Sequence, residues 1–217
     1  MPATTLTISS KNYSSWSLRG WLMTKLSGLA FEEIAVSADD VSARAEILML
    51  SPSILVPCLT YDGTKIWDTL AIGEFLNEIA PAAGLLPADR MHRARCRSIC
   101  GEIHSGFTSL RSALPMNLKA HFPKFKVWSK AQGDIARVTQ IWRECLTASG
   151  GPYLFGKISM ADAMYAPVAT RFRTYDVTLD ETCQAYCDRI LERPEMREWI
   201  EQAMLEEDVL DELEVEY

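Results

Sequence analysis

The chain has 217 residues, of which 48% are hydrophobic and 24% charged, enough to bury the core of one large or two small domains. This composition excludes an intrinsically disordered protein, and no uncharged apolar run reaches the roughly 18 residues of a membrane-spanning helix. No secretory signal is recognisable at the start of the sequence, so we expect a cytoplasmic protein without membrane association.

The net charge of −7 is concentrated at the C-terminal end of the sequence. Nine acidic residues and no basic residue lie between Glu198 and Tyr217, so the rest of the chain is close to neutral. Nucleic-acid binding usually needs a concentrated basic face, and we interpret the arginines between Arg90 and Arg97 as one solvated face of a helix. We therefore expect no nucleic-acid partner.

Cysteine and histidine form no recognisable metal motif. None of the six cysteines belongs to a Cys-x-x-Cys pair, and we expect them to be reduced and mostly buried. Four residues step by four along one predicted helix: His92, Cys96, Cys100 and His104. They span about 18 Å at a rise of roughly 1.5 Å per residue, whereas zinc ligands lie about 2.0–2.3 Å from one ion. We expect no metal.

The sequence from Leu6 to Val36 predicts a strand, a helix and a second strand. Leu6–Ile8 is a short β-prone run, and Asn12–Ser15 supplies helix-capping side chains. Apolar residues then follow at helical spacing up to Gly28, which is placed for a C-cap, and Phe31–Val36 returns as a strand. Strand, helix and strand within about 30 residues form a βαβ unit, whose two strands should be parallel.

A hairpin and two further helices complete the first part of the chain. We expect a short polar helix around Ser42–Leu50, and then two strands at Val56–Tyr61 and Lys65–Trp67, joined by an Asp-Gly turn. Asp68-Thr69 opens another helix. Residues 1–80 are thus predicted to form one α/β domain with the order βαβαββα.

Residues 81–88 are the best linker candidate, and the pattern beyond them is helical throughout. Five apolar stripes at helical spacing are predicted. They are Cys96–Leu114, which is followed by Pro115, and then Ile135–Leu146, Ala161–Phe172, Cys183–Ile190 and Met196–Ala203. We therefore expect residues 89–217 to form a second, all-helical domain.

Three features of the first domain are suited to binding an anionic ligand. The run from Ser14 to Ser17 lies where a strand leads into a helix, so its hydroxyls could cap the helix, or its free N–H groups could bind an anion. Val56-Pro57 precedes a strand, which suits a tight turn with a cis peptide bond that exposes the Val56 backbone to a ligand. Asp68-Thr69 begins a second helix, where a carboxylate could bind.

This arrangement resembles a glutathione transferase: a thioredoxin-like domain followed by the all-helical domain of that family. Gly156-x-x-Ser159-Met160-Ala161-Asp162 is similar to the family's capping box, in which Ser159 would cap a buried helix and Asp162 would bond back. Ser14–Arg19 is similar to the Ser-Ser-Cys-Ser-x-Arg run of zeta-type transferases. Glu102–Phe107 and Pro115–Asn117 resemble a group of bacterial transferase-like proteins.

The resemblance implies a glutathione site in the first domain. The cysteinyl backbone of glutathione would pair with Val56 at the Val56-Pro57 turn, and its γ-glutamyl carboxylate would lie at Asp68-Thr69. Its sulfur would face Ser14 or Ser15, the first candidates for the hydroxyl donor, with Ser17 as a weaker one. The full expected set of glutathione-binding residues is Tyr13, Leu55, Val56, Pro57, Asp68 and Thr69.

The expected function is that of a glutathione-dependent transferase or isomerase, in a homodimer. A serine would activate the thiolate for attack on a small electrophile, which the helical domain would hold with His104 and Arg111 as candidate pocket residues. Isomerisation of a maleyl-type double bond, as in maleylacetoacetate isomerase, is the closest variant.

One departure from the family motivates an alternative. Ile54 and Leu55 stand where the family commonly has glycine and lysine, so the chain could instead be a non-enzymatic glutathione-binding or interaction module on a transferase scaffold.

Overall fold

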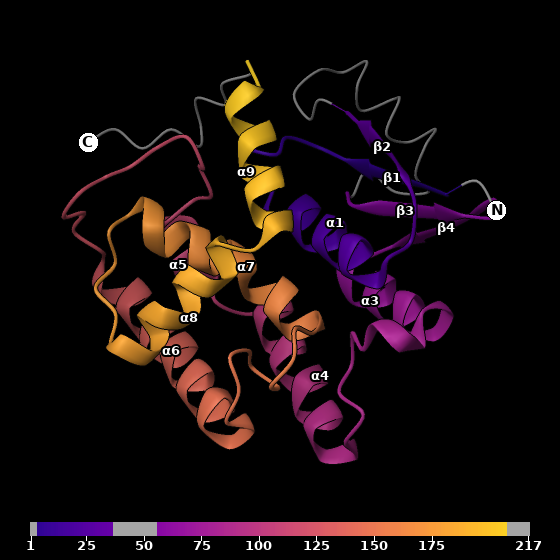
Figure 1. The fold of residues 1–217 in the computed structure, drawn as a ribbon. Helices are drawn as coiled ribbons and strands as arrows, with labels where there is room; N and C mark the ends of the chain where they lie inside the picture. Colours follow the sequence, from indigo (N-terminus) through magenta and orange to yellow (C-terminus); the bar gives the residue numbers. More distant parts are fainter. Residues whose placement is uncertain (1–3, 37–55, 208–217) are drawn as a thin grey trace.

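Four short strands form one mixed sheet in the order β2-β1-β3-β4 (Figure 1). In the computed structural model, which describes residues 4–36 and 56–207, β1 (Thr4–Ile8) runs parallel to β2 (Glu32–Ala35). It runs antiparallel to β3 (Cys58–Tyr61), which forms the hairpin with β4 (Thr64–Trp67). The predicted parallel pair and hairpin are confirmed, whereas the helix expected around Ser42–Leu50 lies outside the described residues.

Two helices lie on the same side of this sheet, between the sheet and the rest of the molecule (Figure 1). α1 (Ser15–Ser27) follows the N-cap Ser14 and ends at Gly28, whose φ of 75° is the left-handed conformation that glycine favours at a C-cap. α3 (Thr69–Ile79) follows the N-cap Asp68, and the 3-10 turn η1 (Pro81–Ala83) comes after it. The structure thus confirms both predicted helix starts.

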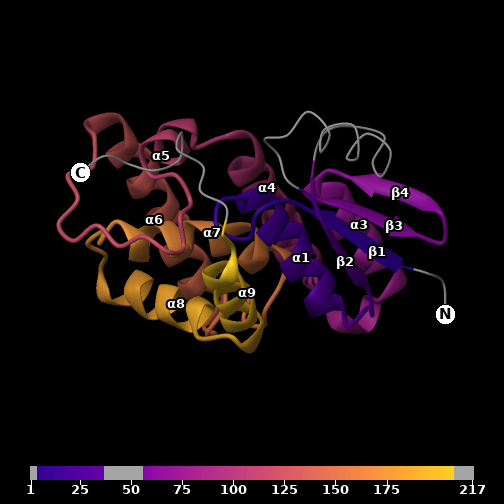
Figure 2. The same ribbon diagram turned by 90° about the horizontal axis from the view of Figure 1, so that it is seen from above.

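The remaining helices form the other half of the molecule (Figure 2). They are α4 (Arg90–Ser105), α5 (Thr108–Ala113), α6 (Ser129–Ser149), α7 (Met160–Thr174), α8 (Glu181–Leu191) and α9 (Pro194–Leu205). No helix within residues 4–36 and 56–207 is long and apolar enough to cross a membrane. The predicted architecture, a thioredoxin-like domain followed by an all-helical one, is confirmed.

The apolar stripe predicted from Cys96 to Leu114 is buried throughout, but it is divided between two helices. α4 ends at Gly106, whose N–H bonds to the Glu102 carbonyl, and Phe107 has a left-handed φ of 57°. The new helix α5 is supported from α6, since the Leu110 N–H donates to the Asp134 carboxylate at 2.9 Å. Apolar spacing continues across the break because both helices face the same core.

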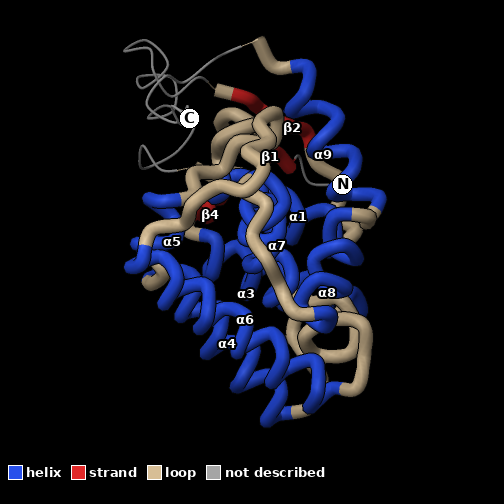
Figure 3. The backbone as a smooth tube through the Cα atoms, turned by 90° about the vertical axis from the view of Figure 1, so that its left-hand side faces the viewer, coloured by secondary structure: helices blue, strands red, loops and turns tan. Residues whose placement is uncertain are grey.

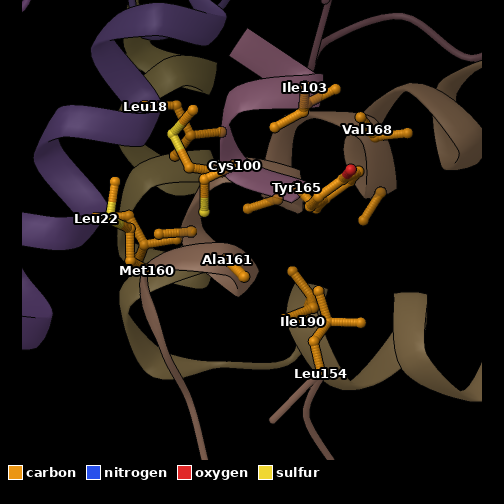
Figure 4. Packing of buried hydrophobic residues seen from close by; sticks show 14 of the residues in the cluster. Leu18, Leu22, Cys100, Ile103, Leu154, Met160, Ala161, Tyr165, Val168 and Ile190 are labelled. Atoms are coloured by element: carbon orange, nitrogen blue, oxygen red, sulfur yellow. The ribbon is translucent and has the colours of Figure 1, made fainter. Parts of the chain in front are cut away.

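α7 is the central helix of the core, and all its residues except Arg173 are buried. It packs against α1 of the first domain and against α4 and α8 of the second. Figure 4 shows Met160, Ala161, Tyr165 and Val168 of α7 among side chains of the neighbouring helices. Because α7 is buried along almost its whole surface and contacts helices of both domains, the two domains share one core.

The predicted capping box at the start of α7 is confirmed. The Ser159 N–H donates to Asp162 Oδ2 at 2.9 Å, and the Ser159 hydroxyl donates to the same oxygen at 2.8 Å. The other oxygen accepts bonds from the Leu154 N–H and the Tyr186 hydroxyl. Asp162 is fully buried, and burial raises the pKa of its carboxyl group to about 6.

α9 brings the end of the chain back to the first domain, where it lies beside α1 (Figures 1 and 3). The indole N–H of Trp199 donates to the Lys11 carbonyl at 2.9 Å, and the Trp199 ring packs on Trp21. After the helix, the Glu206 carboxylate accepts bonds from the Ser10 hydroxyl and the Lys11 and Asn12 N–H groups. Glu206, which follows α9, therefore holds the loop between β1 and α1 in place.

All six cysteines are free and buried, as predicted.

The raised pKa of Asp162 makes stability depend on pH in a defined direction. The folded state holds this proton more tightly than the unfolded chain, whose aspartate pKa is about 3.9. The stabilisation is present below about pH 4 and is lost as pH rises through about 6, a change of roughly 2–3 kcal/mol. Denaturant unfolding of wild type and Asp162→Asn between pH 4 and 7.5 should show this loss in the wild type only. Parallel curves for the two proteins would contradict the prediction.

Candidate functional site

The serine run connects the end of β1 to the first turn of α1. Ser14 is the N-cap: its Oγ accepts the Ser17 N–H at 3.2 Å, and its hydroxyl donates to Ser17 Oγ at 2.9 Å. Ser17 Oγ also accepts the N–H of Ser9, just after β1, at 3.0 Å. Ser17 is fully buried. Its side chain therefore joins strand and helix, whereas Ser14 is only half-buried.

Ser14 and Ser15 line a hollow of about 510 Å³ between the two domains. The Ser15 side chain is largely buried, and within the described residues no hydrogen-bond partner is found for its hydroxyl. Residues of α5, the loop after it and α7 form the opposite wall. The main lining residues on that side are Thr108, Arg111, Ser112, Pro115, Met116 and Arg171, and Tyr13 and Trp16 lie on the serine side.

The turn before β3 packs directly on α1. The Val56-Pro57 peptide bond is cis, as predicted, and Val56 is half-buried. Pro57 lies so close to Gly20 that a Cβ atom at Gly20 would be 2.4 Å from Pro57 Cγ. A glycine at this position therefore lets the turn reach the helix. Leu55, the remaining residue predicted for this turn, lies outside the described residues.

The start of α3 presents a carboxylate and a buried hydroxyl. Asp68 Oδ1 accepts the Leu70 N–H at 2.8 Å, and Asp68 Oδ2 lies 2.6 Å from His104 Nε2 on α4. The Thr69 hydroxyl is buried and has no hydrogen-bond partner among the described residues. A buried hydroxyl without a partner is costly, which makes Thr69 a candidate contact for a ligand.

Trp16 brings the two predicted pocket residues together. Its ring packs on the His104 ring at 5.1 Å, and the guanidinium groups of Arg19 and Arg111 lie over it at 4.6 and 4.8 Å. Such cation–π contacts are stabilising and hold a guanidinium in place. Trp16 was not predicted from the sequence to take part in the site, although it lies between Ser15 and Ser17 in the serine run.

Arg171 is a second residue of the hollow that was not predicted from the sequence. It lines the hollow from α7, and its Nε donates to the Leu114 carbonyl at 2.7 Å. A signal was present in the sequence, because Arg171 continues the spacing of Ala161, Met164 and Val168 on a buried helix face. A charged residue in such a stripe is a candidate functional residue.

Two basic residues near the serine run already have structural partners. The Lys11 ammonium group contacts Glu33 and Gln202 and lies over the rings of Trp21 and Trp199. Arg19 is fully buried, and its Nε donates to the Met164 carbonyl at 2.8 Å. Both side chains therefore join the domains.

Sequence comparison places both halves of the chain in one family. Residues 13–79 match the glutathione S-transferase N-terminal domain, and residues 101–202 match the glutathione S-transferase C-terminal domain. Together the two matches cover more than three quarters of the chain. The protein belongs to the glutathione S-transferase family.

Among individual relatives, the chain is similar to maleylacetoacetate isomerases. It is 29% identical to the maleylacetoacetate isomerase of Rattus norvegicus over 169 residues, which cover 76% of each chain. It is 33% identical to the probable maleylacetoacetate isomerase 1 of Drosophila melanogaster over 131 residues, or 60% of this chain. That match spans about half (52%) of the length of the Drosophila relative.

Solved structures share the fold over almost the whole chain. A glutathione transferase from Methylococcus capsulatus superimposes with a TM-score of 0.71 at 23% identity, covering 94% of this chain and all of that one. The theta class glutathione S-transferase of Xanthomonas axonopodis pv. citri, solved with glutathione bound, gives 0.65 at 21% identity, covering 92% and 98%. At such identities the likeness concerns the fold.

The contact between Gly20 and Pro57 predicts opposite effects for the same substitution at two helical glycines. Gly20→Ala should push the Val56-Pro57 turn off α1 and lower the free energy of unfolding by about 1–3 kcal/mol. Gly133→Ala on α6, where nothing lies within 4 Å of the added Cβ, should raise it by up to about 1 kcal/mol. Denaturant unfolding measures both. Equal effects for the two variants would contradict the importance of the close contact.

Proposed function

We propose that the protein is a glutathione-dependent enzyme of the transferase type, in which a serine of the Ser14–Ser15 pair stabilises the glutathione thiolate. One observation carries this proposal: both serines are at the N-terminus of α1 and line the hollow between the domains. Hydroxyl donors and the positive end of a helix dipole both favour an anion at this point.

Only a few kcal/mol are needed to make the thiolate the major form of bound glutathione at neutral pH. A free thiol has a pKa of about 8.5, so only a few per cent is thiolate at neutral pH. Lowering this pKa by two units takes about 2.7 kcal/mol. A hydrogen bond to a charged group contributes roughly 1.5–3 kcal/mol, so one serine hydroxyl together with the helix N-terminus is sufficient to make thiolate the major species.

The three serines differ in what they can offer a sulfur atom. Ser15 has a hydroxyl without a partner among the described residues, and Ser14 is the more exposed of the pair. The Ser17 oxygen is bonded to Ser14 and Ser9 and is fully buried. We assign the donor to Ser14 or Ser15 and give Ser17 the role of a positioning residue.

Glutathione is proposed to lie along the first domain, away from α5 and α7. Its cysteinyl backbone pairs with Val56 beside Pro57, and its γ-glutamyl carboxylate binds at Asp68-Thr69, where the unpartnered Thr69 hydroxyl donates to it. Tyr13 and Leu55 complete the site. The positive end of the α3 helix dipole adds to the attraction for the carboxylate.

The glutathione thiolate can take part in two kinds of reaction, a transfer and an isomerisation. In a transfer, the sulfur forms a bond to an electrophilic carbon while the bond from that carbon to its leaving group breaks. In an isomerisation, the thiolate adds to a double bond, the resulting single bond rotates, and the thiolate leaves. Similarity to maleylacetoacetate isomerases over 76% of the chain supports the second variant. A homodimer and a cytoplasmic location are part of the same proposal.

The alternative, a glutathione-binding module without catalysis, is motivated by Ile54 and Leu55, which replace the family's glycine and lysine. Ultraviolet difference spectra of the glutathione complex at neutral pH separate the two. Thiolate absorbance supports the enzyme, and binding without ionisation supports the module. No binding at all would contradict both.

Single substitutions test the thiolate donor. Of Ser14→Ala and Ser15→Ala, at least one should lower kcat/KM with an activated aryl chloride tenfold or more and raise the pKa of bound glutathione. Ser14→Ala should also cost about 1 kcal/mol of stability, because it removes the helix cap. Ser98→Ala on α4 is the matched control. Unchanged rates in both variants would contradict the assignment.

Thr69→Val tests the proposed carboxylate contact at α3. It keeps the shape of the side chain but removes a donor to a charged group, which is worth roughly 1.5–3 kcal/mol. The dissociation constant for glutathione, measured by calorimetry, should rise tenfold or more, and Thr69→Ser should restore most of the affinity. Unchanged affinity of the valine variant would place the γ-glutamyl group elsewhere.

A further inference from the structure

The C-cap residue of α9, Glu206, holds the loop that leads into the serine run. Its carboxylate accepts the Ser10 hydroxyl at 2.7 Å and the Lys11 N–H at 2.5 Å. The Asn12 N–H donates to the same carboxylate at 3.0 Å. Ser10 is linked directly to the helix cap, because its carbonyl accepts the Ser14 N–H at 3.0 Å. One carboxylate therefore fixes three consecutive residues just before the serine pair.

Asn12 connects this loop to the opposite wall of the hollow. The residue is fully buried, and its side-chain oxygen accepts the Leu118 N–H at 2.7 Å. Its side-chain nitrogen donates to Asn117 Oδ1 at 3.1 Å. Pro115 and Met116, which line the hollow, come directly before these two residues in the chain. The two walls of the hollow are therefore joined through one asparagine, whose backbone N–H is held from the end of α9.

α9 presents a set of contacts to the same loop. Trp199, Gln202 and Glu206 follow one another at helical spacing, so they lie on one face of the helix. The Trp199 indole donates to the Lys11 carbonyl at 2.9 Å, and the Lys11 ammonium group donates to Gln202. The neighbouring Glu207 is exposed, and none of these hydrogen bonds reaches it. The contact with the loop is therefore specific to one of two adjacent glutamates.

A hydroxyl that stabilises a thiolate has to be held accurately. Groups of a reactive site work only within about 0.5 Å of the productive geometry, and a misplacement of roughly 1 Å can cost about 100-fold in rate. Hydrogen bonds to a carboxylate are stronger than those between neutral groups. The hydrogen bond from the Ser9 N–H to Ser17 Oγ keeps β1 and α1 together independently of Glu206. Losing the carboxylate should therefore leave the fold intact and change the orientation of the serines.

We propose that Glu206 is a positioning residue of the thiolate site. Through Ser10 it fixes the orientation of the Ser14–Ser15 pair, and through Asn12 it fixes the distance of this pair from the opposite wall. Glu206 does not line the hollow, so it acts on the reaction only through the loop. This inference rests on the proposed function, since it concerns the residues that hold the thiolate donor in place.

Amide hydrogen exchange of the free protein tests the connection without glutathione. Glu206→Gln keeps the shape of the side chain but turns one acceptor oxygen into a donor, which cannot accept an N–H group. The N–H groups of Lys11, Asn12 and Leu118 should then exchange about tenfold faster or more. Glu207→Gln is the matched control and should leave them unchanged. Unchanged exchange in Glu206→Gln overturns the proposal, and faster exchange confined to Lys11 and Asn12 overturns the connection to the opposite wall.

The pKa of bound glutathione, measured by ultraviolet difference spectra, separates positioning from a merely structural role. Glu206→Gln should raise this pKa and lower kcat with an activated aryl chloride about tenfold. KM for glutathione should change less than about twofold, because the proposed contacts at Val56 and Thr69 remain. Glu206→Asp, which keeps the charge, should restore part of kcat, and Glu207→Gln should behave as wild type. Lower stability with an unchanged pKa of bound glutathione overturns the proposal.

A double substitution distinguishes a failure of this inference from a failure of the proposed function. Glu206→Gln is combined with whichever of Ser14→Ala and Ser15→Ala lowers the rate. If Glu206 acts through that serine, its own effect on kcat should largely disappear in the double variant. Fully additive effects overturn the positioning role while the serine assignment stands. If neither serine variant changes the pKa of bound glutathione, the proposed function fails, and the positioning role fails with it even where the exchange data confirm the hydrogen bonds.

Discussion

The hydroxyl group of Ser17 joins the end of β1 to the first turn of α1, and the arrangement of the site depends on this junction. Ser17 Oγ receives the N–H of Ser9 and the hydroxyl of Ser14, so strand, loop and helix meet at one buried oxygen. Glu206 holds the same loop from the other side through Ser10, Lys11 and Asn12. With the loop held at both ends, Ser14 and Ser15 reach the hollow in a defined orientation.

α7 connects this junction to the helical domain. All residues of this helix except Arg173 are buried, and the Ser159–Asp162 capping box begins it, so its position is set by the core. Arg19 of α1 bonds to the Met164 carbonyl of α7, and Arg171, two turns further along the helix, lies at the hollow. The element that unites the two domains therefore also delivers one of the cations to the site between them.

Trp16 stands in the serine run and contacts side chains from three other positions around the site. Zeta-type transferases have a cysteine at the corresponding place in the serine run, whereas here an indole ring contacts His104, Arg19 and Arg111. His104 in turn contacts Asp68 at the start of α3. The ring thus connects the start of α1 with α3, α4 and α5, and the aromatic face stabilises cations that have no acidic partner in the described chain.

Much of the fold followed from local sequence. Gly28, Asp68 and Ser159 marked helix ends because capping and left-handed backbone are decided within a few residues, and the Val56-Pro57 turn was recognisable for the same reason. Family membership was also readable, since the serine run and the capping box keep their order and spacing. The break between α4 and α5 at Phe107 could not be predicted from the sequence. Apolar periodicity continues through the break, and the residue that supports the new helix, Asp134, is distant in sequence.

The sequence by itself therefore determined most of the elements, their order and the family, because these depend on neighbouring residues. Only the tertiary structure decided that Ser17 is fully buried while Ser15 lines the hollow, that Pro57 packs on Gly20, and that Arg19 and Arg111 lie over the ring of Trp16. Burial, close approach and charge compensation are properties of groups that are far apart along the chain. These properties are determined only when the two domains pack together through α7.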